Sequence, residues 1–377
     1  MKVIFTGGGT AGHIYPLLSV IREMRKNYSD PDLSLYYFGP KNDRVKTIFS
    51  AEGAKIKNIP SGKFRRYFSI KNIFDIFLIP LGTIKALFIL FFLAPDVIFS
   101  KGGHGSFTTV FAGRLLQIPI FLHESDTILG LSARIQSRWA VEVFTSFRDT
   151  EKVKEDKEVC VGNPIRPILL NGNKKEATKL FKLEGKKPIL LVLGGSLGAR
   201  SINNVILEGL QNLLINFEVI HQTGRMSFKQ TSKEAAVLAR KDLKNRYHVE
   251  AFLNENQLSH ALAVADFIIS RAGGGAIFEI ASAGKPSLLI PLPKSAQDHQ
   301  LKNAYRYQEY GACEVIESAN LKPHFLFEKI KYLFTHPKIL EQMRSRAIDF
   351  SRPKAAKIIA NYLLEFLYRS SVPVKGK

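Results

Sequence analysis

Short apolar runs alternate with amphipathic stretches along the first 162 residues, and the same rhythm starts again at residue 189. The first series predicts strands over 2–6, 33–38, 96–100, 118–122 and 141–145. The second series predicts strands over 189–193, 218–221, 248–252, 266–270 and 287–290. Helical periods separate the runs in both series. This alternation is typical of βαβ units that build a parallel sheet.

The two series open alike, because each begins with a strand that ends in a glycine loop before a helix. Phe5-Thr-Gly-Gly-Gly-Thr-Ala-Gly-His13 opens the first and Leu191-Val-Leu-Gly-Gly-Ser-Leu-Gly-Ala199 opens the second. Such loops present free backbone N–H groups to an anion. We therefore expect an α/β chain with two Rossmann-like domains facing across a cleft, over 1–163 and 164–345. The segment 346–377 is expected to return to the first domain as a C-terminal helix.

The stretch from Ile70 to Leu93 is almost continuously apolar, and Lys63, Arg65 and Arg66 precede it among aromatic residues. A membrane-spanning helix needs about 20 apolar residues. The uncharged part after Lys85 is shorter, and a proline at position 80 is expected to interrupt a longer helix. A buried helix is the simplest alternative. Flanking cations and aromatics favour contact of residues 63–93 with an anionic membrane surface.

Composition adds a strong charge imbalance to this picture. Lys and Arg total 54 against 33 Asp and Glu, a formal net charge of +21, in a chain that is 45% hydrophobic. That field favours an anionic partner. Nucleic acid is disfavoured, because the aromatics gather in one apolar stretch instead of forming exposed stacking platforms. Two distant cysteines predict neither a disulfide framework nor a zinc site, and the N-terminus lacks the apolar region of a signal peptide, so a cytoplasmic location is expected.

The first glycine loop matches G-x-G-x-x-G at Gly7, Gly9 and Gly12, so a dinucleotide site is one hypothesis. That site needs an acid at the end of the second strand, where this chain has Gly39-Pro40. His13, at the start of the helix, is also foreign to the fingerprint. A neutral imidazole there is a candidate general base, because a helix N-terminus lowers its pKa.

The second domain has two anion-binding loops, 194–200 and 270–276, at predicted strand ends. Two such loops at carboxyl ends of strands indicate a ligand crevice. Glu279 lies about one turn into the helix after the second loop, where a carboxylate is suited to a ribose diol. The polar segment 297–303 follows a later strand, and it is either a solvated helix start or a site for sugar hydroxyls.

Six motifs in order along the chain carry a resemblance to a known family: Gly8-Gly-Thr-Ala-Gly-His13, His123-Glu124, Gly162-Asn-Pro-Ile-Arg166, Gly194-Gly-Ser-Leu-Gly-Ala-Arg200, Asp298-His-Gln300 and Asn303. Together they resemble the MurG family of bacterial glycosyltransferases, over residues 1 to about 350. Members add N-acetylglucosamine (GlcNAc) to undecaprenyl-diphospho-muramoyl-pentapeptide, turning lipid I into lipid II. The resemblance implies a GT-B fold, a UDP-GlcNAc donor, a lipid I acceptor, and an inverting transfer in peptidoglycan synthesis for cell-wall growth, shape and division. It also implies a peripheral location on the cytoplasmic face of the inner membrane.

The resemblance assigns roles to individual residues. It implies His13 as general base, with Glu124 orienting or replacing it. The other implied substrate contacts are Thr10, Ala11, Gly12, Asp126, Arg166 and Ser196, then the backbone of Leu253, and finally Gly274, Gly275, Ala276, Glu279 and Gln300. Glu279 is implied for the ribose, Gln300 for the sugar hydroxyls, and residues 274–276 for the diphosphate.

Three positions depart from the family's usual pattern. Asp126 stands where an Asn is usual, so a neutral amide contact becomes a charged acceptor. His104 replaces a Tyr, and Gly274-Gly-Ala-Ile-Phe278 replaces a segment that carries hydroxyl donors. No metal or cofactor is expected, because Asp30-Pro-Asp32 has the composition of a turn and not of a metal site. Two rival functions are a GT-B transferase acting on another lipid acceptor and a basic membrane- or nucleic-acid-binding protein with a vestigial sugar site.

Overall fold

The computed structural model describes residues 1–8, 10–28, 32–62, 70–195 and 198–371 of the chain. It divides into two compact units. Unit 1 consists of Met1–Arg166 with Pro353–Lys377, and unit 2 consists of Pro167–Arg352. The segment that we expected to begin at 346 thus begins at Pro353, because a helix of unit 2 runs on to Phe350.

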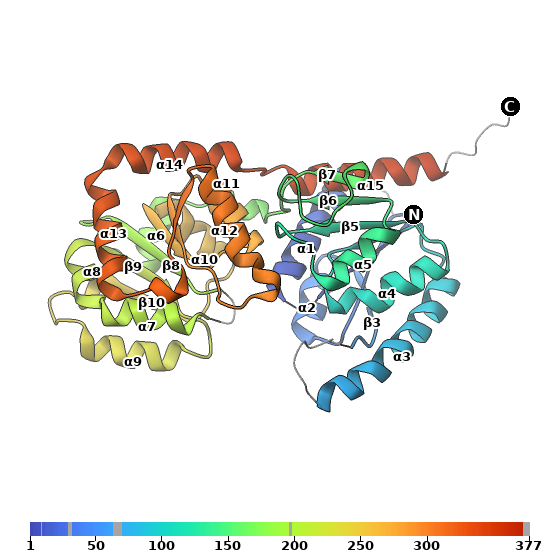
Figure 1. The fold of residues 1–377 in the computed structure, drawn as a ribbon, viewed down its shortest axis with the longest axis horizontal. Helices are drawn as coiled ribbons and strands as arrows, with labels where there is room; N and C mark the ends of the chain where they lie inside the picture. Colours follow the sequence, from blue (N-terminus) through green and yellow to red (C-terminus); the bar gives the residue numbers. More distant parts are fainter. Residues whose placement is uncertain (9, 29–31, 63–69, 196–197, 372–377) are drawn as a thin grey trace. The chain divides into compact units, whose positions relative to one another are not determined.

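Unit 1 is built on a seven-stranded parallel sheet in the order β3-β2-β1-β4-β5-β6-β7. Strands β3, β5, β6 and β7 of this sheet are labelled in Figure 1. In chain order the strands are β1 (Lys2–Thr6), β2 (Ser34–Gly39), β3 (Lys55–Asn58), β4 (Val97–Ser100), β5 (Ile120–Glu124), β6 (Glu142–Thr145) and β7 (Glu158–Cys160). The central strands are almost entirely buried because helices cover both faces, as is usual for parallel sheets.

Helices form a layer on each face of this sheet. One core joins strand residues such as Phe5 and Phe99 to α1 (Ala11–Asn27), α2 (Asp43–Ala51) and α15 (Ala355–Ser371). The opposite core joins Ile4 and Ile98 to α3 (Ile70–Leu93), α4 (His104–Leu115) and α5 (Leu131–Trp139). The last helix of the chain therefore completes the first unit.

Helix α3 runs without a break through Pro80, contrary to the interruption that we expected. Pro80 is exposed, so water can hydrate the carbonyl that loses its partner one turn earlier. Within the described part of the chain, no helix combines the length and the apolarity that crossing a membrane requires.

Unit 2 repeats the plan with a six-stranded parallel sheet in the order β10-β9-β8-β11-β12-β13. Its strands are β8 (Ile189–Leu193), β9 (Glu218–Gln222), β10 (Tyr247–Glu250), β11 (Phe267–Ser270), β12 (Ser287–Leu289) and β13 (Cys313–Val315). Its helices are α6 (Lys174–Phe181), α7 (Arg200–Glu208), α8 (Leu210–Asn216), α9 (Phe228–Leu238), α10 (Glu255–Val264), α11 (Gly274–Ser282), α12 (His299–Glu309), α13 (Pro323–Thr335) and α14 (Pro337–Phe350).

Both sheets reverse strand order at one point, between β1 and β4 in unit 1 and between β8 and β11 in unit 2. Ligands of open α/β sheets bind outside the carboxyl ends of the strands at such a reversal. The glycine loops of the sequence lie at these two places.

Candidate functional site

The loop after β1 leads into α1, whose first turn contains Ala11, Gly12 and His13. N–H groups in the first turn of a helix lack acceptors within the helix, which makes this end suited to an anion. The Thr10 hydroxyl oxygen lies 2.7 Å from Nδ1 of His13. The threonine thus fixes the imidazole ring.

The His13 ring is packed between two glycines from neighbouring loops. A β-carbon placed on Gly8 would lie 3.1 Å from Nδ1, and one placed on Gly103 would lie 3.0 Å from Nε2. Gly103 also has a φ of +79°, a backbone conformation that favours glycine. The loops after β1 and β4 are therefore shaped around this imidazole.

A charged cluster lies at the carboxyl ends of β4 and β5, which pair in the sheet. Lys101 follows β4 directly and is 4% exposed. Glu124 ends β5, and its Oε1 accepts hydrogen bonds from the N–H groups of Ser125 (2.7 Å) and Asp126 (3.1 Å). The two carboxyl groups and the lysine all act electrostatically on one another.

Burial and these charges set the protonation of the site. Loss of hydration around His13, assisted by the Lys101 cation, lowers the pKa of the imidazole to about 4. Burial raises the pKa of Glu124 to about 7, although the Lys101 cation opposes that rise. At neutral pH the imidazole of His13 is therefore neutral and able to accept a proton.

Arg166 is buried in unit 1, and its guanidinium carbon lies 4.1 Å from the ring centre of Tyr15 on α1. The preceding segment is fixed to β5, since Nε2 of His123 lies 3.0 Å from the Gly162 carbonyl oxygen. Ser125 donates its hydroxyl to Asn163 Oδ1 at 2.6 Å. Of the residues predicted for the site, unit 1 thus contains Thr10 to His13, Glu124, Asp126 and Arg166.

In unit 2, α11 begins at Gly274 directly after the β11 loop, with Gly273 at its cap position. The first turn therefore consists of the three predicted residues Gly274, Gly275 and Ala276, which have no side chain or only a methyl group. Glu279 lies further along the same helix and is half-buried. Ser196, predicted in the loop after β8, lies outside the described residues, as does Gly9.

Leu253 is held by a contact that the sequence did not suggest. Its N–H donates to Oε1 of Gln222 at 3.0 Å, and Nε2 of the same glutamine donates to the Gly195 carbonyl at 3.3 Å. Gln222 ends β9 and so joins the loop after β8 to the segment after β10. A base near Leu253 would meet its carbonyl, because the N–H is occupied.

Gln300 lies in the first turn of α12, and its Oε1 accepts the Leu292 N–H at 2.9 Å. Asn303 is buried and donates to the Ala272 carbonyl at 3.2 Å. Arg271 crosses the same region and donates to the carbonyl of Ile290 at 3.0 Å and to Ser201 Oγ at 2.7 Å. These bonds fix the 291–300 segment against the loop after β11.

Sequence reasoning missed Lys101, Gly103 and Gln222. Lys101 follows the apolar run Val97–Ser100 and precedes two glycines, so its place at a strand end was readable, but its burial was not. Gln222 likewise directly follows a predicted strand, 218–221. Polar residues at the carboxyl ends of parallel strands are thus the signal that finds both.

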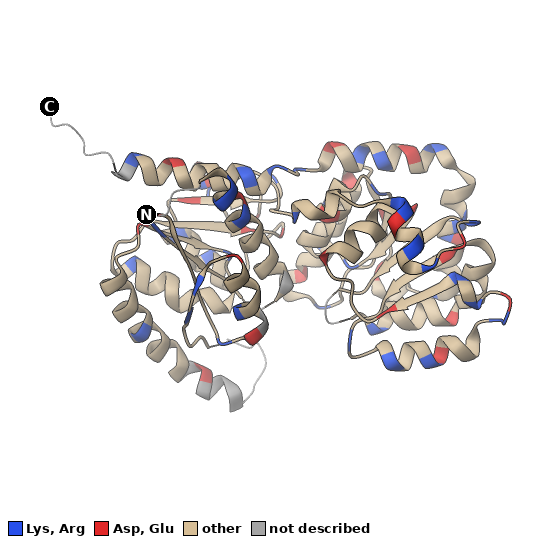
Figure 2. Ribbon diagram, turned by 180° about the vertical axis from the view of Figure 1, so that it is seen from behind, with Lys and Arg blue, Asp and Glu red and all other residues tan. Residues whose placement is uncertain are grey.

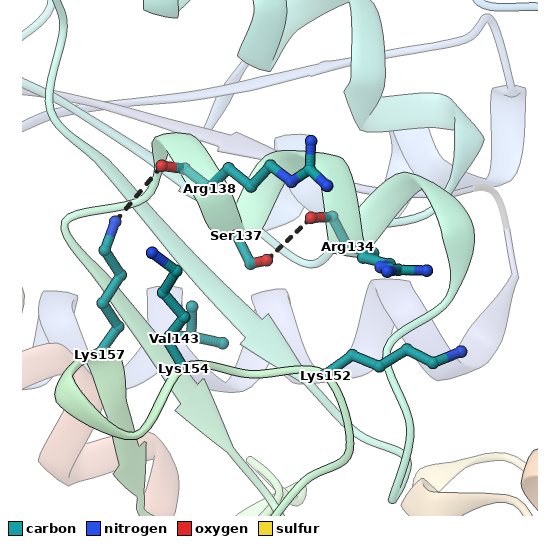
Figure 3. A pocket seen from close by; sticks show the side chains of 7 residues that line it. All are labelled: Arg134, Ser137, Arg138, Val143, Lys152, Lys154 and Lys157. Carbon is teal, nitrogen blue, oxygen red and sulfur yellow. Dashed lines mark hydrogen bonds between the residues drawn. The ribbon is translucent and has the colours of Figure 1, made fainter.

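A second concave region of unit 1 is strongly basic. A cavity of 220 Å³ is lined by Ser137, Val143 and five cationic residues, Arg134, Arg138, Lys152, Lys154 and Lys157 (Figure 3). Lys157 donates to the Ala140 carbonyl at 2.7 Å, at the end of α5. In the described parts of the chain, no ion pair is found for Arg134, Arg138 or Lys154, so an anion is the natural ligand here.

Helix α3 presents an apolar stripe on its outer side. Its exposed members recur at helical spacing, and each is between 58% and 70% exposed: Phe77, Leu81, Ile84, Phe88, Phe91 and Phe92. Ala86 and Leu90, on the opposite side, are buried against the sheet. Figure 2 shows α3 as a largely uncharged helix. The basic and aromatic residues expected at 63–68 lie outside the described residues.

Among the described residues, no three His, Cys, Asp or Glu side chains are grouped so that they could hold a metal ion.

Comparison with known proteins gives a consistent result. Residues 3–145 match the model of the glycosyltransferase family 28 N-terminal domain, and residues 189–359 match the model of its C-terminal domain. A UDP-N-acetylglucosamine–N-acetylmuramyl-(pentapeptide) pyrophosphoryl-undecaprenol N-acetylglucosamine transferase of Clostridium botulinum is 35% identical over 96% of this chain and 99% of the relative. One from Bacillus thuringiensis is 36% identical over 88% and 91%.

Solved structures agree on the fold. The crystal structure of Acinetobacter baumannii MurG superposes with a TM-score of 0.74 at 22% identity, covering 97% of this chain and 99% of the other. A UDP-GlcNAc 2-epimerase from Neisseria meningitidis, solved with UDP-GlcNAc, gives 0.68 at 18% identity, with 97% and 100% covered. The expected pair of Rossmann-like domains is thereby confirmed. From its relatives and its two domain matches, this chain belongs to the MurG family of glycosyltransferase family 28.

Proposed function

We propose that this chain transfers GlcNAc from UDP-GlcNAc to the 4-hydroxyl of the muramoyl sugar of lipid I, giving lipid II, by a single inverting displacement. The observation that carries the choice of substrates is the 35% identity to a transferase of that name over 96% of the chain. The neutral imidazole held between Gly8 and Gly103 supports the chemistry.

In this reaction the acceptor hydroxyl attacks the anomeric carbon from the face opposite UDP. The hydroxyl loses its proton as the new bond forms, and His13 accepts that proton. In the neutral tautomer suited to this step, the imidazole hydrogen is on Nδ1 and points toward Thr10 Oγ1, which lies 2.7 Å away. The lone pair of Nε2 is therefore available to the substrate. Glu124 supports the site as a carboxyl group fixed by two backbone N–H groups.

The leaving diphosphate gains negative charge in the transition state. The backbone N–H groups of Gly274, Gly275 and Ala276 are suited to stabilise this charge, because they lie in the first turn of a helix. These residues also have no side chain or only a methyl group. This stabilisation needs no metal ion, and we expect EDTA to leave the rate unchanged. Loss of activity in EDTA that manganese restores would contradict this part of the proposal.

We propose further donor contacts, most of them with residues of unit 2. Glu279 binds the ribose diol, the Leu253 carbonyl receives a donor of the uracil, and Gln300 meets the sugar hydroxyls. Arg166 and Ser196 contribute to the donor sugar and diphosphate. The Gln222 bond to the Leu253 N–H supports this picture, because it orients the peptide whose carbonyl the base would contact.

We also propose that unit 1 contacts the anionic cytoplasmic face of the bacterial inner membrane as a peripheral protein. Two features of unit 1 support it: the apolar stripe of α3 and the basic cavity beside α5. Binding free energy becomes more favourable when an apolar helix face enters the boundary between headgroups and acyl chains. Each cation near the surface adds about 1 kcal/mol to the binding free energy on anionic lipid.

The test is transfer of labelled GlcNAc from UDP-GlcNAc to a lipid I analogue by the purified chain. Formation of the lipid II analogue with inverted anomeric configuration is the expected result. Turnover of UDP-GlcNAc with a different lipid, but not with lipid I, would instead identify a GT-B transferase of another acceptor. Absence of transfer to any acceptor would reject the proposed enzyme.

A further inference from the structure

A buried side-chain amide, that of Gln136 on α5, forms hydrogen bonds with three serines from β4, α4 and α5. Its Oε1 accepts the hydroxyl of Ser100 at 2.7 Å. Its Nε2 donates to Ser106 Oγ at 3.0 Å and to Ser132 Oγ at 2.8 Å. The Ser100 hydroxyl also accepts the Gly102 N–H at 3.1 Å. Gln136, Ser100 and Ser106 are fully buried, so these bonds form away from water.

Two of the three hydroxyls meet at one carbonyl oxygen, that of Gly103. Ser106 donates to it at 3.0 Å and Ser132 at 2.8 Å. Ser106 Oγ also lies 3.3 Å from Gln136 Oε1, but the Gly103 carbonyl is the nearer acceptor. A hydroxyl has a single proton, and the Gln136 N–H groups direct it away from themselves. The amide thus sets the direction in which both serines donate.

The Gly103 backbone borders the imidazole that we propose as the general base. A β-carbon on Gly103 would lie 3.0 Å from Nε2 of His13. A rotation of this peptide would therefore change the space around Nε2. Two hydrogen bonds to its carbonyl oxygen restrict that rotation, and fully satisfied buried networks are rigid.

We propose that Gln136 is a positioning residue for the base: it orients the hydroxyls of Ser106 and Ser132, which fix the Gly103 backbone beside the imidazole of His13. The proposal rests on the proposed role of His13. An apolar side chain at position 136 leaves the two hydroxyls free to turn away from Gly103. A network that only packs α5 against α4 would instead affect stability and leave kcat unchanged.

The experiment compares Gln136→Met, Ser132→Ala and Ser132→Thr in the full chain. Methionine has a similar length and lacks the amide. Alanine removes one of the two donors to the Gly103 carbonyl, and threonine restores it at a half-buried position. The matched control is Val110→Ala, which truncates a buried residue of α4 that has no polar side-chain atom. Measured quantities are kcat and KM for UDP-GlcNAc, Tm, and the His13 ring signals by NMR.

Gln136→Met is expected to lower kcat about tenfold, because a small displacement of a catalytic group is costly. KM for UDP-GlcNAc should stay unchanged, because the proposed donor contacts lie mostly in unit 2. Ser132→Ala should cause a smaller loss of kcat, and Ser132→Thr should restore it. Val110→Ala should lower Tm and leave kcat unchanged.

Unchanged kcat in folded Gln136→Met would overturn the proposal. An equal loss of kcat in Val110→Ala would do the same, because it would trace the effect to stability alone. Ser132→Thr as slow as Ser132→Ala would also contradict it, since the hydroxyl is then not what matters. If Gln136→Met does not fold, the two serine variants decide the question.

The His13 ring signals, assigned by comparison with His13→Ala, need no substrate. They are expected to shift in Gln136→Met and Ser132→Ala and to stay in place in Val110→Ala. If the wild-type chain transfers no GlcNAc to any acceptor, the proposed function fails on that result alone. The ring signals then still decide whether Gln136 positions His13, and unmoved signals would reject it.

Discussion

The Nε2 atom of His13 lies 3.0 Å from the place that a β-carbon on Gly103 would occupy. The two residues come from different loops, one opening α1 and the other opening α4. A side chain at position 103 would therefore crowd the nitrogen that is proposed to accept the substrate proton.

Gly103→Ala is expected to reduce kcat by at least tenfold while the chain stays folded. The added methyl group displaces the imidazole, and a misplaced general base loses much of its contribution of about 10²–10⁴. Steady-state transfer assays and circular dichroism measure the two effects. Gly185→Ala is the matched control, because Gly185 has a similar φ of +68° but open space at the β-carbon position. A similar loss of kcat in the control would attribute the effect to backbone strain.

His13→Ala is expected to lower kcat by about 10²–10⁴, with UDP binding unchanged. Thr10→Val is expected to cause a smaller loss, because it removes only the oxygen that orients Nδ1. Rapid-quench assays with a lipid I analogue and calorimetric titration with UDP separate the two quantities. Full activity in His13→Ala would remove this residue from the mechanism and leave the enzyme assignment intact.

Glu124→Gln is expected to change how stability depends on pH. Burial raises the pKa of Glu124 to about 7 in the folded chain, against about 4.3 when unfolded. The native state therefore holds an extra proton between these values, and its stability falls as pH rises through this window. The variant lacks this dependence, so wild type should lose about 3 kcal/mol relative to it from pH 4 to 8. Urea unfolding at several pH values measures this, with exposed Glu208→Gln as control.

The central strands of both sheets were predictable because burial on both faces gives continuous apolar runs, as in Leu190–Val192. Three short strands were not predicted, namely Lys55–Asn58, Glu158–Cys160 and Cys313–Val315. All three lie at sheet edges. Lys55–Asn58 shows the reason, because three of its four residues are exposed and the strand forms only by pairing with β2.

The candidate site likewise has one part that the sequence predicts and another part that it does not. Glycine loops at strand ends could be read from spacing, because the backbone requirement is local. The burial of Lys101 and the bond from Gln222 to Leu253 depend on which strands become neighbours, and strand order is not written in any local pattern. Pro80 shows the converse. The local rule predicts that a proline interrupts a helix, but α3 continues through Pro80, which is exposed to solvent.

Replacing Phe88, Phe91 and Phe92 together by Ser is expected to abolish flotation with vesicles containing phosphatidylglycerol. The three rings are between 66% and 70% exposed, so the change should leave the core intact. Ile89 is left unchanged because it packs against the core. The control is Met226→Ser/Val237→Ser, which removes two similarly exposed residues of unit 2. Unchanged flotation of the folded triple variant would contradict membrane contact through α3.

Arg134→Glu/Arg138→Glu is expected to weaken the same vesicle binding at low salt by at least tenfold. The two side chains line the basic cavity, and reversing them removes attraction to anionic headgroups. Neutral phosphatidylcholine vesicles and 0.5 M salt provide the comparison, since screening should erase the difference. Equal binding of wild type and variant at low salt would exclude the cavity from the membrane contact.

Glu279→Ala is expected to weaken UDP binding by about tenfold, the effect of losing a charged hydrogen bond of roughly 1.4 kcal/mol. The same change should leave the affinity for 2′,3′-dideoxy-UDP nearly unaltered, because that analogue lacks the diol. Calorimetric titration of both ligands tests the assignment. Equal losses for the two ligands would place Glu279 away from the ribose.

The return of the chain to unit 1 has a consequence for its synthesis. Ala356, Ile359, Ala360 and Leu363 of α15 fill one core of the first sheet. These residues are translated after unit 2, which is continuous from Pro167 to Arg352. Unit 2 can therefore fold during translation. Unit 1 stays open along one apolar face until α15 has been translated, and a chain that stops short of α15 exposes that face to chaperones and proteases.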